Sequence, residues 1–217
     1  REEAPEVVLL LDRSASMGGG AGDKDRLVRE LCAGLAYVGL AARCPVTVMV
    51  CAQGGPVTVG SWRSHRKVDQ MLACLEGLGE PDGETHLRGL RHLRPPSAAG
   101  RVAFVISDFL VDPLPGEMAV ALARGSGAGC LLHVITDAER HPSLPRSCTL
   151  WDPESRRQLF VADAAALAGA YGRELAAHED AVAQLAAGHG VGSHRVSDGA
   201  PFEKTVASVC GTQGAGR

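Results

Sequence analysis

Short apolar runs alternate with amphipathic segments along most of the chain. Nearly continuous apolar runs, which are typical of strands buried on both faces of a sheet, occupy residues 7–11, 46–51, 102–106 and 130–135. Apolar residues recur at helical spacing in residues 25–43, 67–78, 87–93, 114–124 and 164–187. A last strand and a last helix are expected at 191–196 and 202–209. This alternation predicts a three-layer Rossmann-type α/β fold with a mostly parallel sheet.

Some segments add detail to this prediction. Residues 57–59 follow a Gly-Gly-Pro turn and predict a short antiparallel strand at one edge of the sheet. Residues 142–153 have the composition of a loop with Trp151 packed beneath it, and residues 157–161 predict an extra strand. We interpret the apolar stripe of residues 164–187 as a face packed on the core rather than as a groove for a partner.

Composition and charge narrow the functional classes. The net charge is −3, from 22 basic and 25 acidic residues without long runs of either sign, and aromatic residues make up 4% of the chain. A nucleic-acid binder needs a concentrated basic face and aromatic stacking platforms, so we predict no nucleic-acid partner. No stretch reaches the roughly 18 apolar residues of a membrane-spanning helix, so we predict no membrane span in this segment.

Cysteine usage and chain length bear on compartment and domain count. The seven cysteines form no Cys-x-x-Cys pair, which predicts reduced, mostly buried thiols in a cytoplasmic protein. Without a repeat or a linker in the sequence, we expect a single domain over residues 1–217 with an ordered core at about 6–210. Because the chain starts with Arg1, we also expect it to be a fragment of a longer protein. Membrane association through a region outside this chain stays an open alternative.

Two of the predicted strands end in a carboxylate. Asp12 follows the first strand, and Asp108 follows the strand at 102–106. Ligands of open parallel sheets bind at the carboxyl ends of the strands, so both side chains are candidates for a site. Ser14 and Ser16 follow Asp12 at alternate positions, and a carboxylate with two hydroxyls supplies hard oxygen ligands. Such a set suits Mg²⁺ or Mn²⁺, which take octahedral oxygen sites and retain waters.

The Asp-x-Ser-x-Ser motif after a hydrophobic strand resembles the metal-ion-dependent adhesion site of von Willebrand factor A domains. That family also has a threonine in a later loop and an aspartate after a later strand, and Thr85 and Asp108 match them in order. The resemblance implies that Ser14, Ser16 and Thr85 offer hydroxyls to the cation. It implies that Asp12 and Asp108 bind the cation directly or through waters. It further implies that an acidic side chain of a partner completes the site, so that binding is sensitive to chelators.

A narrower resemblance covers about residues 6–210. Segments 11–17, 107–110 and 151–154 (Trp-Asp-Pro-Glu) resemble the bacterial family catalogued as domain of unknown function 58. Members are typically encoded beside MoxR-type AAA+ ATPases. The resemblance therefore implies an adaptor or substrate-delivery partner of such an ATPase. An acidic side chain of the ATPase or of its client would then bind at the metal. Segment 137–139 departs from the Asp-Pro-x-Glu-like sequence expected there, and we assign it no metal role.

The same residues allow other interpretations. Singly, Asp12 and Asp108 could be strand-end turn residues, with the serines capping the next helix, or the set could be a vestigial site that no longer uses a metal. The alternative function is a metal-dependent hydrolase of the phosphatase type, for which Glu84 is the spare acid or base. Phosphatases of the haloacid dehalogenase type, however, need an aspartate where this chain has Ser14. We therefore predict a binding module and not an enzyme.

Overall fold

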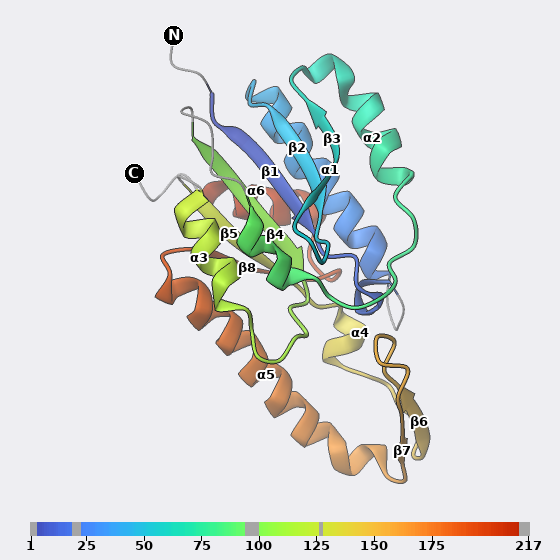
Figure 1. Ribbon diagram of the computed structural model, residues 1–217. Helices are drawn as coiled ribbons and strands as arrows, with labels where there is room; N and C mark the ends of the chain where they lie inside the picture. The colour runs from blue at the N-terminus through green and yellow to red at the C-terminus, as the bar shows by residue number, and fades with distance from the viewer. Residues whose placement is uncertain (1–3, 19–22, 94–99, 126–127, 213–217) are drawn as a thin grey trace.

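The computed structural model describes residues 4–18, 23–93, 100–125 and 128–212 (Figure 1). A six-stranded sheet lies at its centre, with the strands in the order β3-β2-β1-β4-β5-β8. These strands are β1 (Glu6–Leu11), β2 (Val46–Val50), β3 (Val57–Trp62), β4 (Arg101–Ser107), β5 (Ala128–Val134) and β8 (Gly192–Val196). β3 pairs antiparallel with β2 and the other neighbours pair parallel, which confirms the expected mostly parallel sheet with one antiparallel edge strand.

Helices cover both faces of this sheet (Figure 1). They are α1 (Lys24–Ala41), α2 (Val68–Glu76), α3 (Gly116–Gly125), α4 (Asp137–Arg140), α5 (Ala164–Gly188) and α6 (Phe202–Thr212), with 3₁₀ turns at Ala15–Met17, His65–Lys67 and Leu87–His92. Successive side chains of a strand point to opposite faces. Leu9 and Leu11 of β1 accordingly join the core formed with α1, α2 and α6, whereas Val8 and Leu10 join the core formed with α3 and α5. The three-layer prediction is confirmed.

A second, two-stranded sheet stands apart from the first. Residues 142–153, expected to be a loop, contain β6 (Cys148–Trp151), which pairs antiparallel with β7 (Gln158–Val161). β6 left little signal in the sequence because most side chains of this hairpin are exposed and no alternating pattern develops. Trp151, expected to pack beneath the loop, is exposed as well, so that expectation is wrong.

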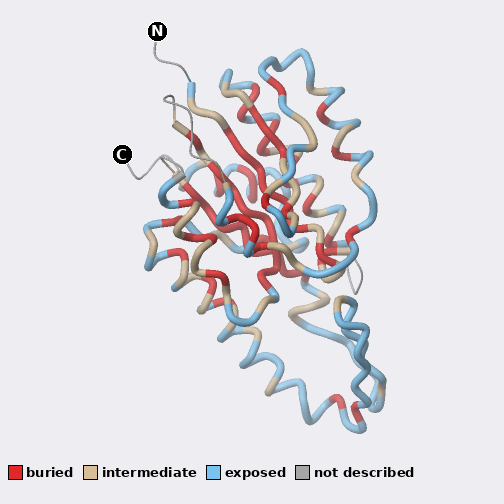
Figure 2. The backbone as a smooth tube through the Cα atoms, viewed as in Figure 1, coloured by how far each residue is buried: buried red, intermediate tan, exposed pale blue. Residues whose placement is uncertain are grey.

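The first half of the long helix α5 projects beyond the sheet together with the β6–β7 hairpin (Figures 1 and 2). Val182 is fully buried, whereas Leu167 and Tyr171 are 47% and 40% exposed. The expectation that the whole apolar stripe packs on the core is therefore wrong for this half. The segment stays helical because it is rich in alanine, the strongest helix former, and because Asp163 caps its first turn through the Ala166 amide.

The short helix α4, which the sequence analysis did not predict, follows β5. Thr136 and Glu139 form a reciprocal capping box, in which each side chain accepts a hydrogen bond from the backbone amide of the other residue. The Thr-x-x-Glu signal was present in the sequence, but four residues are too few to establish a helical period. The capping box fixes Glu139 close to the carboxyl end of the sheet.

Candidate metal site

Asp12 is the centre of a hydrogen-bonded group at the carboxyl end of the sheet. Its backbone amide donates to the Ile106 carbonyl at 3.0 Å, which continues β1 along β4 by one residue. One carboxylate oxygen accepts the Ser14 amide at 3.1 Å. The other accepts the hydroxyls of Thr85 at 2.9 Å and Ser107 at 2.7 Å. The carboxylate is buried, so these bonds replace the contacts with water that it gives up.

The loop that follows β1 brings two serine hydroxyls into this group. Ser14 is buried, and its Oγ lies 3.1 Å from Ser16 Oγ. A backbone hydrogen bond of 3.0 Å from Ala15 N to Gly83 O fixes this loop against the loop that carries Thr85. The structure therefore brings together four of the five predicted residues, Asp12, Ser14, Ser16 and Thr85.

The fifth predicted residue, Asp108, lies beside this group at the end of β4. Its Oδ2 accepts the ammonium of Lys24 at 2.9 Å, and its Oδ1 accepts the Leu110 amide at 3.2 Å. Lys24 is itself buried and also pairs with Glu139 at 2.5 Å. Asp108 is joined to the Asp12 group through its neighbour Ser107, whose hydroxyl donates to Asp12.

Sequence reasoning missed three side chains at this site. Ser107 donates to Asp12, Lys24 neutralises Asp108, and Glu154 accepts the Ser16 hydroxyl at 3.0 Å from the turn between β6 and β7. Ser107 and Glu154 both lie in segments on which the family resemblance rests, so a signal for them was present. Lys24 gave none, because a lysine at the start of an amphipathic helix is usually solvated.

Negative charge dominates the site. Burial raises the pKa of Asp12, and the charge of Asp108 raises it further, although hydrogen bonds, the strongest from Ser107, oppose both. Burial also raises the pKa of Glu154, again with a contribution from Asp108. For Lys24, burial lowers the pKa, but two neighbouring carboxylates outweigh burial and raise it above the ordinary lysine value. The ammonium of Lys24 is therefore charged at neutral pH and balances part of this negative charge.

The oxygen spacings fit the hard divalent cation that the resemblance implies. Adjacent ligands of an octahedral Mg²⁺, each about 2.1 Å from the ion, lie about 3.0 Å apart. The corresponding spacings here are 3.1 Å between the Oγ atoms of Ser14 and Ser16 and 2.9 Å between Thr85 Oγ1 and Asp12 Oδ2. In the part of the chain that the structure describes, no group of three or more His, Cys, Asp or Glu side chains could hold a metal. The candidate set is rich in hydroxyls instead, which suits Mg²⁺ or Mn²⁺ rather than zinc.

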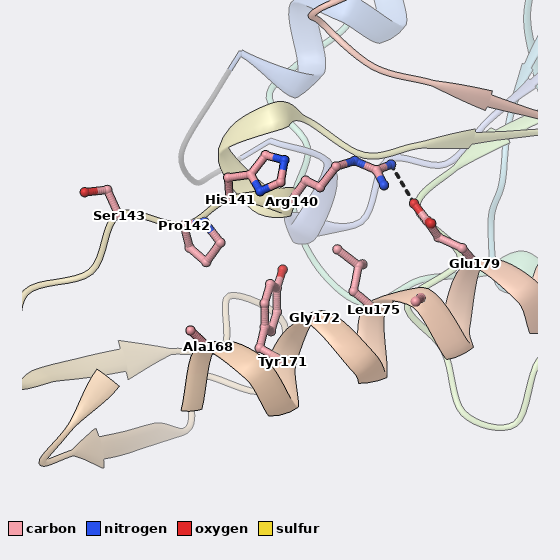
Figure 3. Close-up of a pocket in the computed structure, with 10 residues that line it drawn as sticks. Arg140, His141, Pro142, Ser143, Ala168, Tyr171, Gly172, Leu175 and Glu179 are labelled. Atoms are coloured by element: carbon pink, nitrogen blue, oxygen red, sulfur yellow. Dashed lines mark hydrogen bonds and ion pairs between the residues drawn. The ribbon is translucent and has the colours of Figure 1, made fainter. Parts of the chain in front are cut away.

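The helices α4 and α5 meet next to the site (Figure 3). The Tyr171 hydroxyl donates to a backbone carbonyl of α4 at 2.6 Å, and Arg140 donates to Glu179 at 2.6 Å. These residues line a hollow of 560 Å³ between the two helices. Further along α5, His178 Nε2 lies 3.0 Å from the backbone carbonyl oxygen of Asp108. α5 is thereby tied to the loop that carries a predicted site residue.

Several solved structures share this architecture over nearly the whole chain. BatB, a conserved hypothetical protein from Bacteroides thetaiotaomicron, has 15% identity and a TM-score of 0.55, with 98% of this chain and 100% of that chain covered. An aerotolerance-related membrane protein from Bacteroides fragilis has 15% identity and a TM-score of 0.53, with 96% and 100% covered. The pilus adhesin SpaC from Lactobacillus rhamnosus GG has 11% identity and a TM-score of 0.55, with 98% and 30% covered. A comparison with curated proteins found no match.

The sheet order, the helices on both of its faces and these likenesses define a von Willebrand factor A-like α/β domain. The family described as "Protein of unknown function DUF58" matches residues 1–181, and the chain belongs to this family. Both resemblances drawn from the sequence motifs are confirmed at the level of fold and family. No helix within the described residues is both long and apolar enough to cross a membrane.

Proposed function

We propose that this domain is a protein-binding module that holds a divalent cation, Mg²⁺ or Mn²⁺, at the carboxyl end of its sheet. The ligands would be Asp12, Ser14, Ser16, Thr85 and Asp108, with Asp108 acting through water or through its charge. The observation that carries the proposal is the convergence of carboxylate and hydroxyl oxygens from two loops at spacings of 2.9 and 3.1 Å. When bound, the cation supplies an open coordination position for an oxygen ligand from outside.

The partner in this proposal is a protein that presents an Asp or Glu side chain. Three hydroxyls and one direct carboxylate leave a divalent cation only partly neutralised, so an incoming carboxylate is favoured over a neutral ligand. The family resemblance suggests a MoxR-type AAA+ ATPase, or the client of that ATPase, as this partner. Von Willebrand factor A-like domains often serve in protein interactions, and one structural neighbour is a pilus adhesin.

The arrangement supports binding better than hydrolysis. A hydrolase needs a general acid or base within reach of the cation. The sequence offered Glu84 for this role, but its side chain is exposed at the surface. Glu154, the acidic side chain found beside the site, already accepts a hydrogen bond from Ser16. We therefore propose no catalytic residue.

The test measures whether the immobilised 217-residue chain captures the MoxR-type ATPase that is encoded in the same genome. Capture is compared in Mg²⁺ and in a chelator. Asp12→Ala removes the central carboxylate, and Thr85→Val removes one hydroxyl while keeping the side-chain shape. Asp82→Ala is the matched control, because Asp82 is an exposed carboxylate in the same loop as Thr85. We expect capture to be lost with chelator and with both site variants and retained with the control. Capture indifferent to chelator and to Asp12→Ala would refute a metal-bridged interface.

A further inference from the structure

The turn of the β6–β7 hairpin reaches into the candidate metal site. Glu154 lies in this turn, and its Oε1 accepts the Ser16 hydroxyl at 3.0 Å. The backbone of Thr85 lies near the same carboxylate and favours its charged form. Glu154 therefore contacts the loop after β1 and lies near the loop that carries Thr85, although 138 positions separate it from Ser16 in the sequence.

Glu154 brings a further negative charge to a site that already holds two carboxylates. Asp108 and Asp12 are its negatively charged neighbours, whereas the Ser16 hydroxyl donates a hydrogen bond to it. The buried ammonium of Lys24 pairs with Asp108 and Glu139 instead. A divalent cation bound by Asp12 and Glu154 would offset the repulsion between these two carboxylates, because it would be the largest local charge.

The hairpin turn is organised in a way that presents Glu154. Asp152 Oδ1 accepts the Glu154 amide at 3.0 Å, and the Ser155 hydroxyl donates to the same carboxylate. Two backbone hydrogen bonds of 2.9 Å close the turn, from Asp152 N to Arg157 O and from Arg156 N to Asp152 O. An aspartate followed by proline favours this kind of turn. The acidic side chain is thus held on a turn that is closed by hydrogen bonds.

The rest of the hairpin is held down by little apolar packing. Trp151, Leu159 and Phe160 are 63%, 62% and 69% exposed. Figure 2 shows the hairpin as a mostly exposed segment beside the first half of α5. Moving the hairpin away from the site would therefore expose little buried apolar area, so its displacement requires little free energy.

We propose that Glu154 is an internal ligand that binds the cation in the position a partner's Asp or Glu would take. This inference rests on the proposed function of the site. The Ser16 Oγ to Glu154 Oε1 distance of 3.0 Å matches the spacing of adjacent ligands around Mg²⁺, as the other oxygen pairs do. The free domain is then occluded by its own hairpin, and an acidic partner binds by displacing Glu154.

The first experiment titrates the 217-residue chain with Mn²⁺ and follows free Mn²⁺ by electron paramagnetic resonance. Water-proton relaxation in the same samples reports how many exchangeable waters the bound Mn²⁺ carries. We compare Glu154→Ala with Glu84→Ala, which removes an exposed carboxylate next to Thr85 in the chain. We expect Glu154→Ala to weaken Mn²⁺ binding about tenfold or more and to add one exchangeable water. Glu84→Ala should change neither quantity.

The second experiment adds acetate, which supplies a carboxylate and nothing else. In Glu154→Ala loaded with Mn²⁺, acetate should displace the additional water and lower the relaxation rate. In the wild-type chain, acetate should have no such effect, because Glu154 already fills the position. Glu154→Gln keeps the side-chain shape and an oxygen without the charge, so it should weaken Mn²⁺ binding as Glu154→Ala does, with circular dichroism as the check on folding.

The outcomes separate this inference from the function on which it rests. Equal Mn²⁺ affinity and hydration in the wild-type chain and in Glu154→Ala, with binding lost in Asp12→Ala, would overturn the internal ligand and leave the metal site standing. No Mn²⁺ binding by the wild-type chain would overturn both. Weaker binding with an added, acetate-displaceable water in Glu154→Ala would support both.

Discussion

Replacement of Lys24 by methionine tests the charge balance of the site. The side chains of Lys24 and Asp108 are 5% and 3% exposed, and Nζ lies 2.9 Å from Oδ2. Removal of one partner from such a pair leaves an uncompensated buried charge, which costs about 3–5 kcal/mol. The second partner, Glu139, is 29% exposed, so water takes over most of that contact. We expect Lys24→Met to lower the free energy of unfolding by about 3–5 kcal/mol at neutral pH without divalent cations.

Arg26→Met is the matched control for this prediction, because it removes another basic side chain from the first turn of the same helix. Arg26 pairs with Glu30 at 3.0 Å, but the two side chains are 70% and 47% exposed, so the control should lose only about 0.3–0.5 kcal/mol. Urea unfolding followed by circular dichroism in the presence of a chelator measures both variants. Equal losses in the two variants would refute the reasoning.

The pH dependence of this contribution has a defined sign. The folded-state pKa of Lys24 is raised, so its stabilising effect is fully present below the ordinary lysine pKa and is lost as the pH rises through the folded value. The ionisation of Lys24 itself should therefore add no pH dependence to the unfolding of the wild-type chain across the neutral range. Under the proposed function, Mg²⁺ should stabilise Lys24→Met more than the wild-type chain, because the cation then neutralises Asp108 alone.

Further predictions concern groups away from the metal. Burial, and secondarily a neighbouring imidazole, lower the pKa of His133 to about 4. The unfolded chain therefore binds more protons than the folded chain below pH 6.5, and urea unfolding should show a loss of about 2 kcal/mol of stability between pH 7 and pH 5. His133→Leu should abolish that loss. A Cβ at Gly89 would lie 2.2 Å from the backbone oxygen of Ala52, so Gly89→Ala should lower the stability measured by thermal unfolding by about 1–3 kcal/mol. Gly116→Ala is the control and should be nearly neutral, because a Cβ at Gly116 meets open space. Burial raises the pKa of the Cys32 thiol, and two other cysteines are also buried. A thiol reagent at pH 8 should therefore modify at most four of the seven cysteines until urea unfolds the chain.

The central part of the fold was predictable because burial on both faces leaves a strong sequence signal. β1 and β4 contain long apolar runs, and their residues are almost all buried in the structure. β6 escaped prediction for the opposite reason. Its residues Thr149 and Leu150 are both exposed, so neither burial nor alternation marked the segment as a strand.

The candidate site was predictable to the extent that it follows from strand ends. Asp12 and Asp108 terminate adjacent parallel strands, so topology alone places them near one another. The pairing of Asp108 with Lys24 was not predictable, because it depends on where α1 begins relative to β4, which is a property of tertiary packing. The contact between Ser16 and Glu154 is of the same kind, since no local pattern relates residues 138 positions apart.

The position of the hairpin nevertheless follows from the lengths of two elements. α5 has 25 residues and is about 38 Å long, whereas β5, with seven residues, spans about 23 Å. Because β5 and β8 run parallel, α5 must return to the amino end of the sheet, and its excess length projects past the carboxyl end. The β6–β7 hairpin immediately precedes α5 and is carried out to the same end. An α5 shortened by two turns within its exposed first half should therefore draw Glu154 away from Ser16 while leaving the packed half of the helix and the sheet intact.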